Sequence, residues 1–347
     1  MKKILSASAA LMMTTGLASA GGLDRSGQPV GALFETGSYA ELSFGQVNPS
    51  VSGNMNAALP PPTGGAPSGD MAPSYAQFGA AYKADLFGGT SLAIIVDQPY
   101  GADVDYDRAG YALDGANAEV DTTGLSILLR FKVNENFSLH GGVRTVTASG
   151  VYDVPAVPDL DGPGPASAKP AYASTYSKDT GMGYVVGAAY ERPDIAMRIA
   201  LTYSSPVDLA LDGSAGDLST TMPESVNLDF QTGIAQDTLL FGSVRYAAWD
   251  GFALTDSIAG DILSYDNDVY TYTIGIGRQF TDKLSASFSV GYEAPTDEPT
   301  SNLGPTDGYI SYQLGAAYMI ADGVELSGGI RYVNIGDATT TIGSEFK

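Results

Sequence analysis

The sequence of 347 residues has no cysteine and only one histidine. Without cysteine the chain can form no disulfide and no thiolate metal site, and it cannot carry a lipid anchor on a cysteine. A Ser-His-Asp triad would have to use His140, which stands beside Gly141 and Gly142 with no nucleophile motif nearby. Walker and H-E-x-x-H motifs are also missing. We therefore expect no enzyme activity, no catalytic residue, no metal and no cofactor.

Basic residues are scarce. The chain has 17 Lys and Arg against 39 Asp and Glu, which gives a net charge of −22. So acidic a chain argues against nucleic acid as a partner. The acids gather in a few segments such as Asp103–Asp107 and Ala294–Thr300. These segments are either ordinary solvated loops or loops that face the cell exterior, where divalent cations would bridge them to lipopolysaccharide.

Apolar runs as long as a transmembrane helix are absent after residue 20. Residues 1–20 have the three parts of a signal peptide, namely Lys2 and Lys3, the apolar stretch Ile4–Leu17, and an A-x-A site at Ala18–Ala20. This pattern predicts export, with Gly21 as the first mature residue.

Strict alternation of apolar and polar residues takes the place of long apolar runs. In the hairpin Gly308–Val333, every second residue from Ile310 to Ile320 and from Val324 to Tyr332 is apolar or small. Each arm has about ten residues, which is the length of a strand that crosses a bilayer at a tilt. The same unit recurs along the chain and predicts thirteen strands. They are Ser38–Val51, Tyr75–Leu86, Thr90–Tyr100, Val120–Val133, Phe137–Val151, Gly181–Tyr190, Met197–Ser205, Ser225–Ala235, Thr238–Trp249, Tyr270–Phe280, Leu284–Tyr292, Tyr309–Ile320 and Val324–Asn334.

Short and long connections alternate between these strands without exception. The short ones include Phe87–Gly89 and Ala321–Gly323, and the long ones include Gly101–Glu119 and Pro206–Glu224. A soluble sandwich does not need this order, whereas an up-and-down barrel has tight turns at one rim and long loops at the other. We therefore predict an all-β fold, a transmembrane up-and-down antiparallel β-barrel over residues 38–347 in the outer membrane of a Gram-negative cell.

The polar face of the predicted strands would line the barrel interior, and many of the basic residues lie on this face. These residues are Arg130, Lys132, His140, Arg144, Arg198, Arg245 and Arg331. Two interpretations stay open. The residues could pair with lumen carboxylates such as Asp229 and Glu325 and stiffen the barrel, or together they could attract anions.

Residues Gly21–Gly37 precede the first strand and do not alternate. The segment is rich in glycine and mildly apolar. It is either a disordered exported tail or a plug that folds into the mouth of the barrel.

A family resemblance rests on three stretches. GGLDRSGQPVGALFE followed by GSYAELSFGQVNPSVSG, IALTYSSPVDLALDG (Ile199–Gly213) and MPESVNLDFQTGIAQDTLLFGSVRYAAWDGF (Met222–Phe252) resemble FadL/TodX-type outer-membrane transporters. The resemblance implies a fourteen-stranded barrel plugged by an N-terminal hatch. It also implies transport of long-chain fatty acids or aromatic hydrocarbons past the hatch tip to a lateral opening in the wall. The implied ligand-contacting hatch residues are Gly21, Gly22, Leu23, Arg25, Val30, Leu33 and Phe34.

This sequence departs from the family pattern in three ways. The hatch is short, and the Asn-Pro-Ala motif expected before the first strand is missing, since Asn48-Pro49 lies within the first predicted strand. Thirteen strands also leave the last one ending outside, so we expect a fourteenth strand beyond Lys347.

Three function classes follow from these observations. The first is a channel for facilitated uptake of hydrophobic or amphipathic ligands such as long-chain fatty acids, which the hatch-like segment favours. The second is a porin for small anionic solutes. The third is a structural or adhesive surface barrel that acts through its acidic loops. In each case the expected surroundings are outer-membrane lipid and lipopolysaccharide, and the expected state is a monomer.

Overall fold

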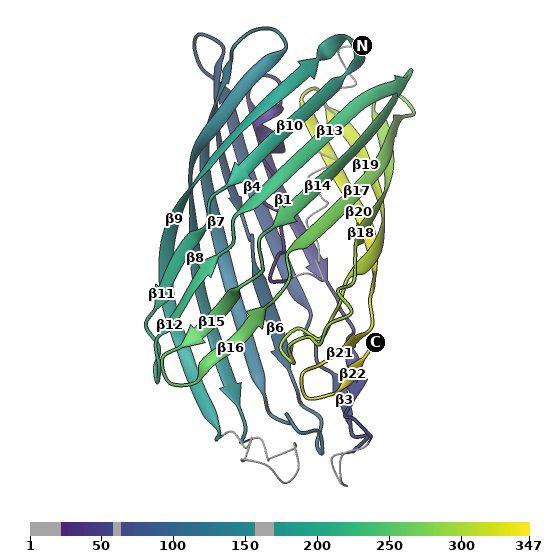
Figure 1. Cartoon of the computed structure of the whole chain (residues 1–347). Coiled ribbons are helices and arrows are strands. Elements are labelled where there is room, and N and C mark those ends of the chain that lie inside the picture. The colour runs from purple at the N-terminus through teal and green to yellow at the C-terminus, as the bar shows by residue number, and fades with distance from the viewer. Residues whose placement is uncertain (1–21, 58–63, 157–169) are drawn as a thin grey trace.

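The computed structural model describes residues 22–57, 64–156 and 170–347. Its largest element is an antiparallel sheet that curls into a barrel (Figure 1). Thirteen strands follow one another around this wall. They are β1 (Tyr39–Val47), β4 (Tyr75–Asp85), β5 (Thr90–Asp97), β7 (Asn117–Lys132), β8 (Phe137–Val154), β9 (Tyr172–Arg192), β10 (Met197–Ser204), β13 (Ser225–Ala235), β14 (Thr238–Ala247), β17 (Val269–Gln279), β18 (Leu284–Glu293), β19 (Tyr309–Ala321) and β20 (Val324–Ile335). Each overlaps one strand predicted from alternation, so the predicted fold class is confirmed.

The wall strands turn their apolar residues outward. On β7, the alternate residues Leu125, Ile127 and Leu129 are 37%, 40% and 50% exposed, whereas the intervening Leu128 and Arg130 are 0% and 3% exposed. A soluble protein would bury the first set. Lipid satisfies an apolar outer face, and the inner face can then hold polar side chains. No helix in the described residues is long and apolar enough to span a membrane.

Short strands lie at the rim that carries the long connections, at the bottom of Figure 1. One four-stranded sheet contains β11 (Val207–Leu211), β12 (Leu218–Met222), β15 (Phe252–Asp256) and β16 (Gly260–Tyr265). A second contains β2 (Ser52–Asn54), β3 (Pro67–Asp70), β21 (Ala338–Thr339) and β22 (Glu345–Phe346). Alternation did not predict these strands, because they are two to six residues long and lie in the long connections or in the tail after the last predicted strand.

The described residues form three buried apolar clusters, and residues of the hatch segment belong to two of them. The first of these two lies toward the long-loop rim, where β11, β12, β15 and β16 pack against β8 and β9 with Tyr100 and Trp249 among their side chains. The second lies toward the short-turn rim and contains residues of the 3-10 helix η1 (Gly31–Phe34) packed on inward side chains of β4, β5, β7, β9 and β10. The hatch segment therefore runs through the barrel interior and contributes to both clusters.

The strands β1 and β20 stand at the two ends of the wall order. Within the described residues no backbone pairing joins them, and the outward residues Phe44 and Ile330 are 77% and 74% exposed. The expected fourteenth strand stays a prediction. The predicted signal peptide, residues 1–20, and Gly21 lie outside the described residues.

Candidate ligand-transport site

The hatch tip, residues 22–25, is attached to the wall at residues 99–101, which follow β5. The backbone N–H of Arg25 donates to the carbonyl of Pro99 at 2.8 Å, and the N–H of Gly101 donates to the carbonyl of Leu23 at 2.9 Å. These two bonds flank a bridge between Asp24 and Tyr100. The hatch tip thus extends the barrel sheet by one short antiparallel pair.

Trp249 fixes how closely the tip approaches the far wall. Gly22 has φ +62°, and a Cβ atom added there would lie 2.4 Å from Cε2 of the Trp249 indole. Only glycine allows both this backbone conformation and this contact. The indole in turn packs edge-on against Tyr100, with ring centroids 5.9 Å apart. The predicted tip residues Gly22 and Leu23 therefore lie beside buried aromatic rings.

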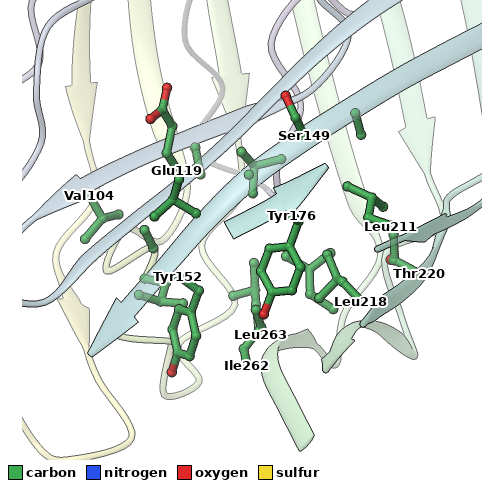
Figure 2. Close-up of a pocket in the computed structure, with 18 of the residues that line it drawn as sticks. Val104, Glu119, Ser149, Tyr152, Tyr176, Leu211, Leu218, Thr220, Ile262 and Leu263 are labelled. Carbon is green, nitrogen blue, oxygen red and sulfur yellow. The ribbon is translucent and has the colours of Figure 1, made fainter. Parts of the chain in front are cut away.

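A mostly apolar cavity lies near the long-loop rim, and Figure 2 shows side chains that line it. About 590 Å³ of space not filled by atoms, part of it open to solvent, lies among its lining residues, which come from β6–β9 on one side and from β11, β12, β15 and β16 on the other. Tyr152 and Tyr176 face Leu218 and Leu263 across it (Figure 2). Among the lining residues in the described chain, Glu119 alone carries a charge.

The hatch tip and the cavity belong to one apolar cluster. Leu23, which is 2% exposed, shares this cluster with Leu211, Leu218 and Leu263, all of which line the cavity. A hydrophobic molecule in the cavity would therefore meet side chains of the same cluster to which the hatch tip belongs. We expect movement of the tip to change the floor of the cavity.

The wall is interrupted next to the hatch tip. The strand of β5 continues as β6 (Gly101–Asp105), but pairing with β7 shifts by one residue between Asp97↔Gly124 and Gly101↔Asp121. The N–H of Tyr100 donates to the Thr122 hydroxyl at 2.9 Å instead of to a backbone carbonyl. The extra residue acts as a β-bulge, which bends the strand and ends its pairing on one side.

That side faces β4. Residues Ala80–Asp85 of β4 pair with β5, but residues 75–79 pair only with β1 in the described chain. The Gln98 side chain partly compensates, because its Oε1 accepts from the Phe78 N–H at 2.9 Å. A break without backbone hydrogen bonds therefore separates the long-loop half of β4 from β6.

The rest of the hatch packs near the short-turn rim. Val30, Leu33 and Phe34 are buried there and do not line the apolar cavity. The Phe34 ring lies between the Arg130 and Arg198 guanidinium groups, each 4.7 Å from its centroid, and His140 meets it edge-on at 5.6 Å. Of the seven predicted hatch residues, Gly22 and Leu23 lie beside the apolar cluster that lines the cavity, whereas these three pack in the other cluster; contact with a ligand stays a prediction.

Glu35 follows η1 and is buried. Burial raises the pKa of this carboxyl group to about 7, and the nearby Glu41 and Glu325 carboxylates act in the same direction while Arg198 opposes them. The seated hatch therefore holds an acid that titrates near neutral pH.

The predicted basic residues mostly face the hatch or the wall. Asp24 accepts from Arg245 Nε and Nη2 at 3.1 and 2.9 Å, and Gln28 accepts from Arg144. Arg130 pairs with Glu191, Arg331 donates to Ser311 at 3.0 Å, and Lys132 is exposed at the short-turn rim. In the described residues Arg130 and Arg245 form ion pairs with the carboxylates of Glu191 and Asp24, and Asp229 attracts Arg198 and Arg245 without a direct ion pair.

Several important residues escaped sequence reasoning. Asp24 and Gln28 carry polar contacts between hatch and wall, yet the stretch that resembles the family gave them no role. Tyr100 looked like the last residue of an ordinary strand. The break itself depends on a one-residue excess between two strands, and apolar periodicity does not reveal such an excess within a long connection.

Comparisons with known proteins agree with this architecture. Residues 87–344 match the family model "Outer membrane protein transport protein (OMPP1/FadL/TodX)". A Pseudomonas aeruginosa FadL homologue has 19% sequence identity and a TM-score of 0.74, with 98% of this chain and 94% of that chain covered.

Two toluene transporters are similar at lower identity. For Pseudomonas putida TodX the identity is 12% and the TM-score 0.62, and for Ralstonia pickettii TbuX they are 13% and 0.60; each comparison covers 91% of this chain and 88% of the other. At these identities the likeness shows the fold alone. A search of curated proteins found no match. The family model covers most of the chain, and the chain therefore belongs to the OMPP1/FadL/TodX family of outer-membrane transport proteins, whose members are β-barrels of the outer membrane.

Proposed function

We propose that this protein lets hydrophobic small molecules cross the outer membrane without an energy source of its own. A ligand would enter the apolar cavity near the long-loop rim, displace the hatch tip at Leu23, and leave sideways through the break between β4 and β6. The observation that carries this proposal is the single apolar cluster that contains both cavity-lining leucines and the hatch tip.

The lining of the cavity favours an uncharged ligand over a ligand with a carboxylate group. Removing a methylene group from water contributes about 0.8 kcal/mol, so an apolar lining suffices to bind a hydrocarbon. A carboxylate would need a cation or several donors, since an unpaired buried charge is costly. The one charged lining residue in the described chain is the acid Glu119, and most of the basic interior residues already contact the hatch. Long-chain fatty acids therefore rank second to hydrocarbons.

The buried hatch favours a hydrophobic-ligand channel over an open anion porin. Ala32 and Leu33 are fully buried in the interior cluster, and Arg144 and Arg245 hold Gln28 and Asp24. Ions would find few free cationic side chains along such a lumen. We further propose a monomer surrounded by outer-membrane lipid and lipopolysaccharide.

An uptake assay tests the function. Cells without their own transporter would express the wild type, Ala148→Phe or Thr147→Phe, and uptake of radiolabelled toluene and of a long-chain fatty acid would be measured. Ala148 is 3% exposed and lines the cavity, whereas Thr147 lies on the opposite face of β8. We expect toluene uptake above the empty-vector level, a loss of at least tenfold in Ala148→Phe, and little change in Thr147→Phe. Equal uptake by all three proteins would contradict the proposal.

A further inference from the structure

The side chain of Arg25 fills the break between β4 and β6. On one side, its guanidinium carbon lies 4.0 Å from the centroid of the Tyr75 ring on β4. On the other side it touches Gly101 of β6, where an added Cβ atom would lie 2.4 Å from the same carbon. Arg25 is only 7% exposed although it carries a full charge. It therefore joins two strand edges that lack backbone pairing.

Strand parity places the guanidinium within the wall itself. Tyr75 shares the inward face of β4 with Ala81 and Lys83, which contact the interior. Gly101 lies on the opposite face of β6 from Ala102 and Val104, which line the cavity. A group that touches an inward ring and an outward-facing glycine position must pass between the two strands.

Arg25 is held in a way that permits release. In the described residues no carboxylate lies within salt-bridge distance of it, in contrast to Arg245, which binds Asp24 with two nitrogens. Its side chain rests on the face of one aromatic ring and is attracted by the Asp103 and Glu119 carboxylates without a direct ion pair, which is a weaker attachment than a buried bidentate ion pair. Its backbone is fixed by the same short pair that attaches the hatch tip at Pro99 and Gly101. If the tip detaches, Arg25 leaves the break with it.

We propose that Arg25 is the gate of the lateral break. With the hatch seated, its guanidinium closes the wall between Tyr75 and Gly101, and when a ligand lifts the hatch tip, the withdrawal of Arg25 opens a passage to the surrounding lipid. This inference rests on the proposed function and adds the residue that controls the exit.

The glycine at position 101 allows a sharp test. Gly101 has no positive φ, so its backbone accepts alanine, but the new methyl group would overlap the guanidinium and expel it. Gly101→Ala and Arg25→Ala should therefore open the same gate by different means. Gly328→Ala is the matched glycine control, because an added Cβ there meets nothing within 4 Å. Arg192→Ala, which removes an exposed arginine at a short turn, is the matched arginine control.

The measurement is the initial rate of toluene uptake by cells that express each protein, with folding checked by the heat-dependent gel shift of the barrel. We expect Arg25→Ala, Gly101→Ala and Tyr75→Leu each to raise the rate about threefold or more. The double variant Arg25→Ala/Gly101→Ala should be no faster than either single variant, and both controls should match the wild type.

The outcomes separate the gate from the function. If the wild type takes up toluene and the three variants take it up at the same rate, the gate is refuted and the proposed function stands. Additive effects in the double variant would also refute it, because the two substitutions would then act on different features. If folded wild type takes up no toluene above the empty-vector level, both proposals fall.

Discussion

Asp24 of the hatch and Arg245 of β14, which are 221 positions apart in the sequence, form a buried bidentate ion pair. The two side chains are 7% and 10% exposed. Removing one partner of such a pair leaves an uncompensated buried charge, which costs about 3–5 kcal/mol. The pair is thus the strongest polar attachment between hatch tip and wall.

We therefore predict that Asp24→Ala loosens the hatch while the barrel stays folded. Hydrogen–deuterium exchange of residues 22–34 should become faster by two or more orders of magnitude, because a loss of 1.4 kcal/mol corresponds to about a factor of ten. Asp208→Ala is the control, since this exposed carboxylate accepts a hydrogen bond from Thr221 of its own hairpin and does not contact the hatch in the described residues. Unchanged protection of the hatch in Asp24→Ala would show that the ion pair does not hold it.

Phe34 provides the second attachment. A cation–π contact contributes about 0.5–2 kcal/mol, and Phe34 makes two of them, with Arg130 and Arg198. Phe34→Leu keeps most of the apolar volume and loses both contacts, so cleavage of the hatch by added protease should become roughly tenfold faster. Phe44→Leu, on the outer face of β1, should cleave like the wild type. Equal rates for the two variants would contradict this role of Phe34.

Glu35 should make hatch seating depend on pH. Burial raises its pKa to about 7 in the seated hatch, whereas a solvated glutamate has a pKa of about 4.5. Between these values the seated state binds the proton and the released state does not, so seating is favoured at low pH. The free-energy advantage that Glu35 gives to the seated hatch is complete below about pH 4.5 and is lost as the pH rises to about 7. Above pH 7, Glu35 no longer makes seating depend on pH.

The single tryptophan offers a direct readout of this titration, because Trp249 packs on Gly22 at the hatch tip. We expect its fluorescence to report a less seated hatch at pH 7.5 than at pH 5, and Glu35→Gln to reduce this difference strongly. A wild-type signal that is flat over this range, or a pH response that Glu35→Gln retains, would exclude Glu35 as its source.

Alternation was sufficient to locate all thirteen wall strands because successive residues face lipid and the barrel interior in turn, so that apolar and polar residues alternate. Leu125, Ile127 and Leu129 had to share a face whatever else the fold contained. The resemblance in residues 21–35 predicted a hatch, and residues of this segment pack inside the barrel. Local pattern and family likeness carried this part of the fold.

The contacts that make the site were beyond such reasoning. Arg25, Tyr75 and Gly101 meet because a bulge at residues 98–100 turns β6 away from β4, and nothing in their local sequence indicates it. The basic side chains could be assigned to the interior by parity, but parity cannot distinguish a side chain that awaits a ligand from one that holds Phe34 or Asp24. Only the three-dimensional path of the hatch separates these roles.

A disulfide lock tests most directly whether the hatch must move for transport. Asp24 and Tyr100 are a non-hydrogen-bonded antiparallel pair, whose Cα atoms are typically about 4.5 Å apart, within the range that a disulfide spans. The chain has no native cysteine, so Asp24→Cys/Tyr100→Cys introduces the only thiols. The single-cysteine variants, treated with the same oxidant, are the controls.

The measurement is toluene uptake by the double-cysteine protein before and after reduction. We predict that the oxidised protein takes up toluene at less than a tenth of the rate of the reduced protein, and that reduction restores uptake while the single-cysteine variants do not respond. Equal uptake by the oxidised and reduced forms, with the cross-link verified by mass spectrometry, would contradict a hatch that has to leave its seat.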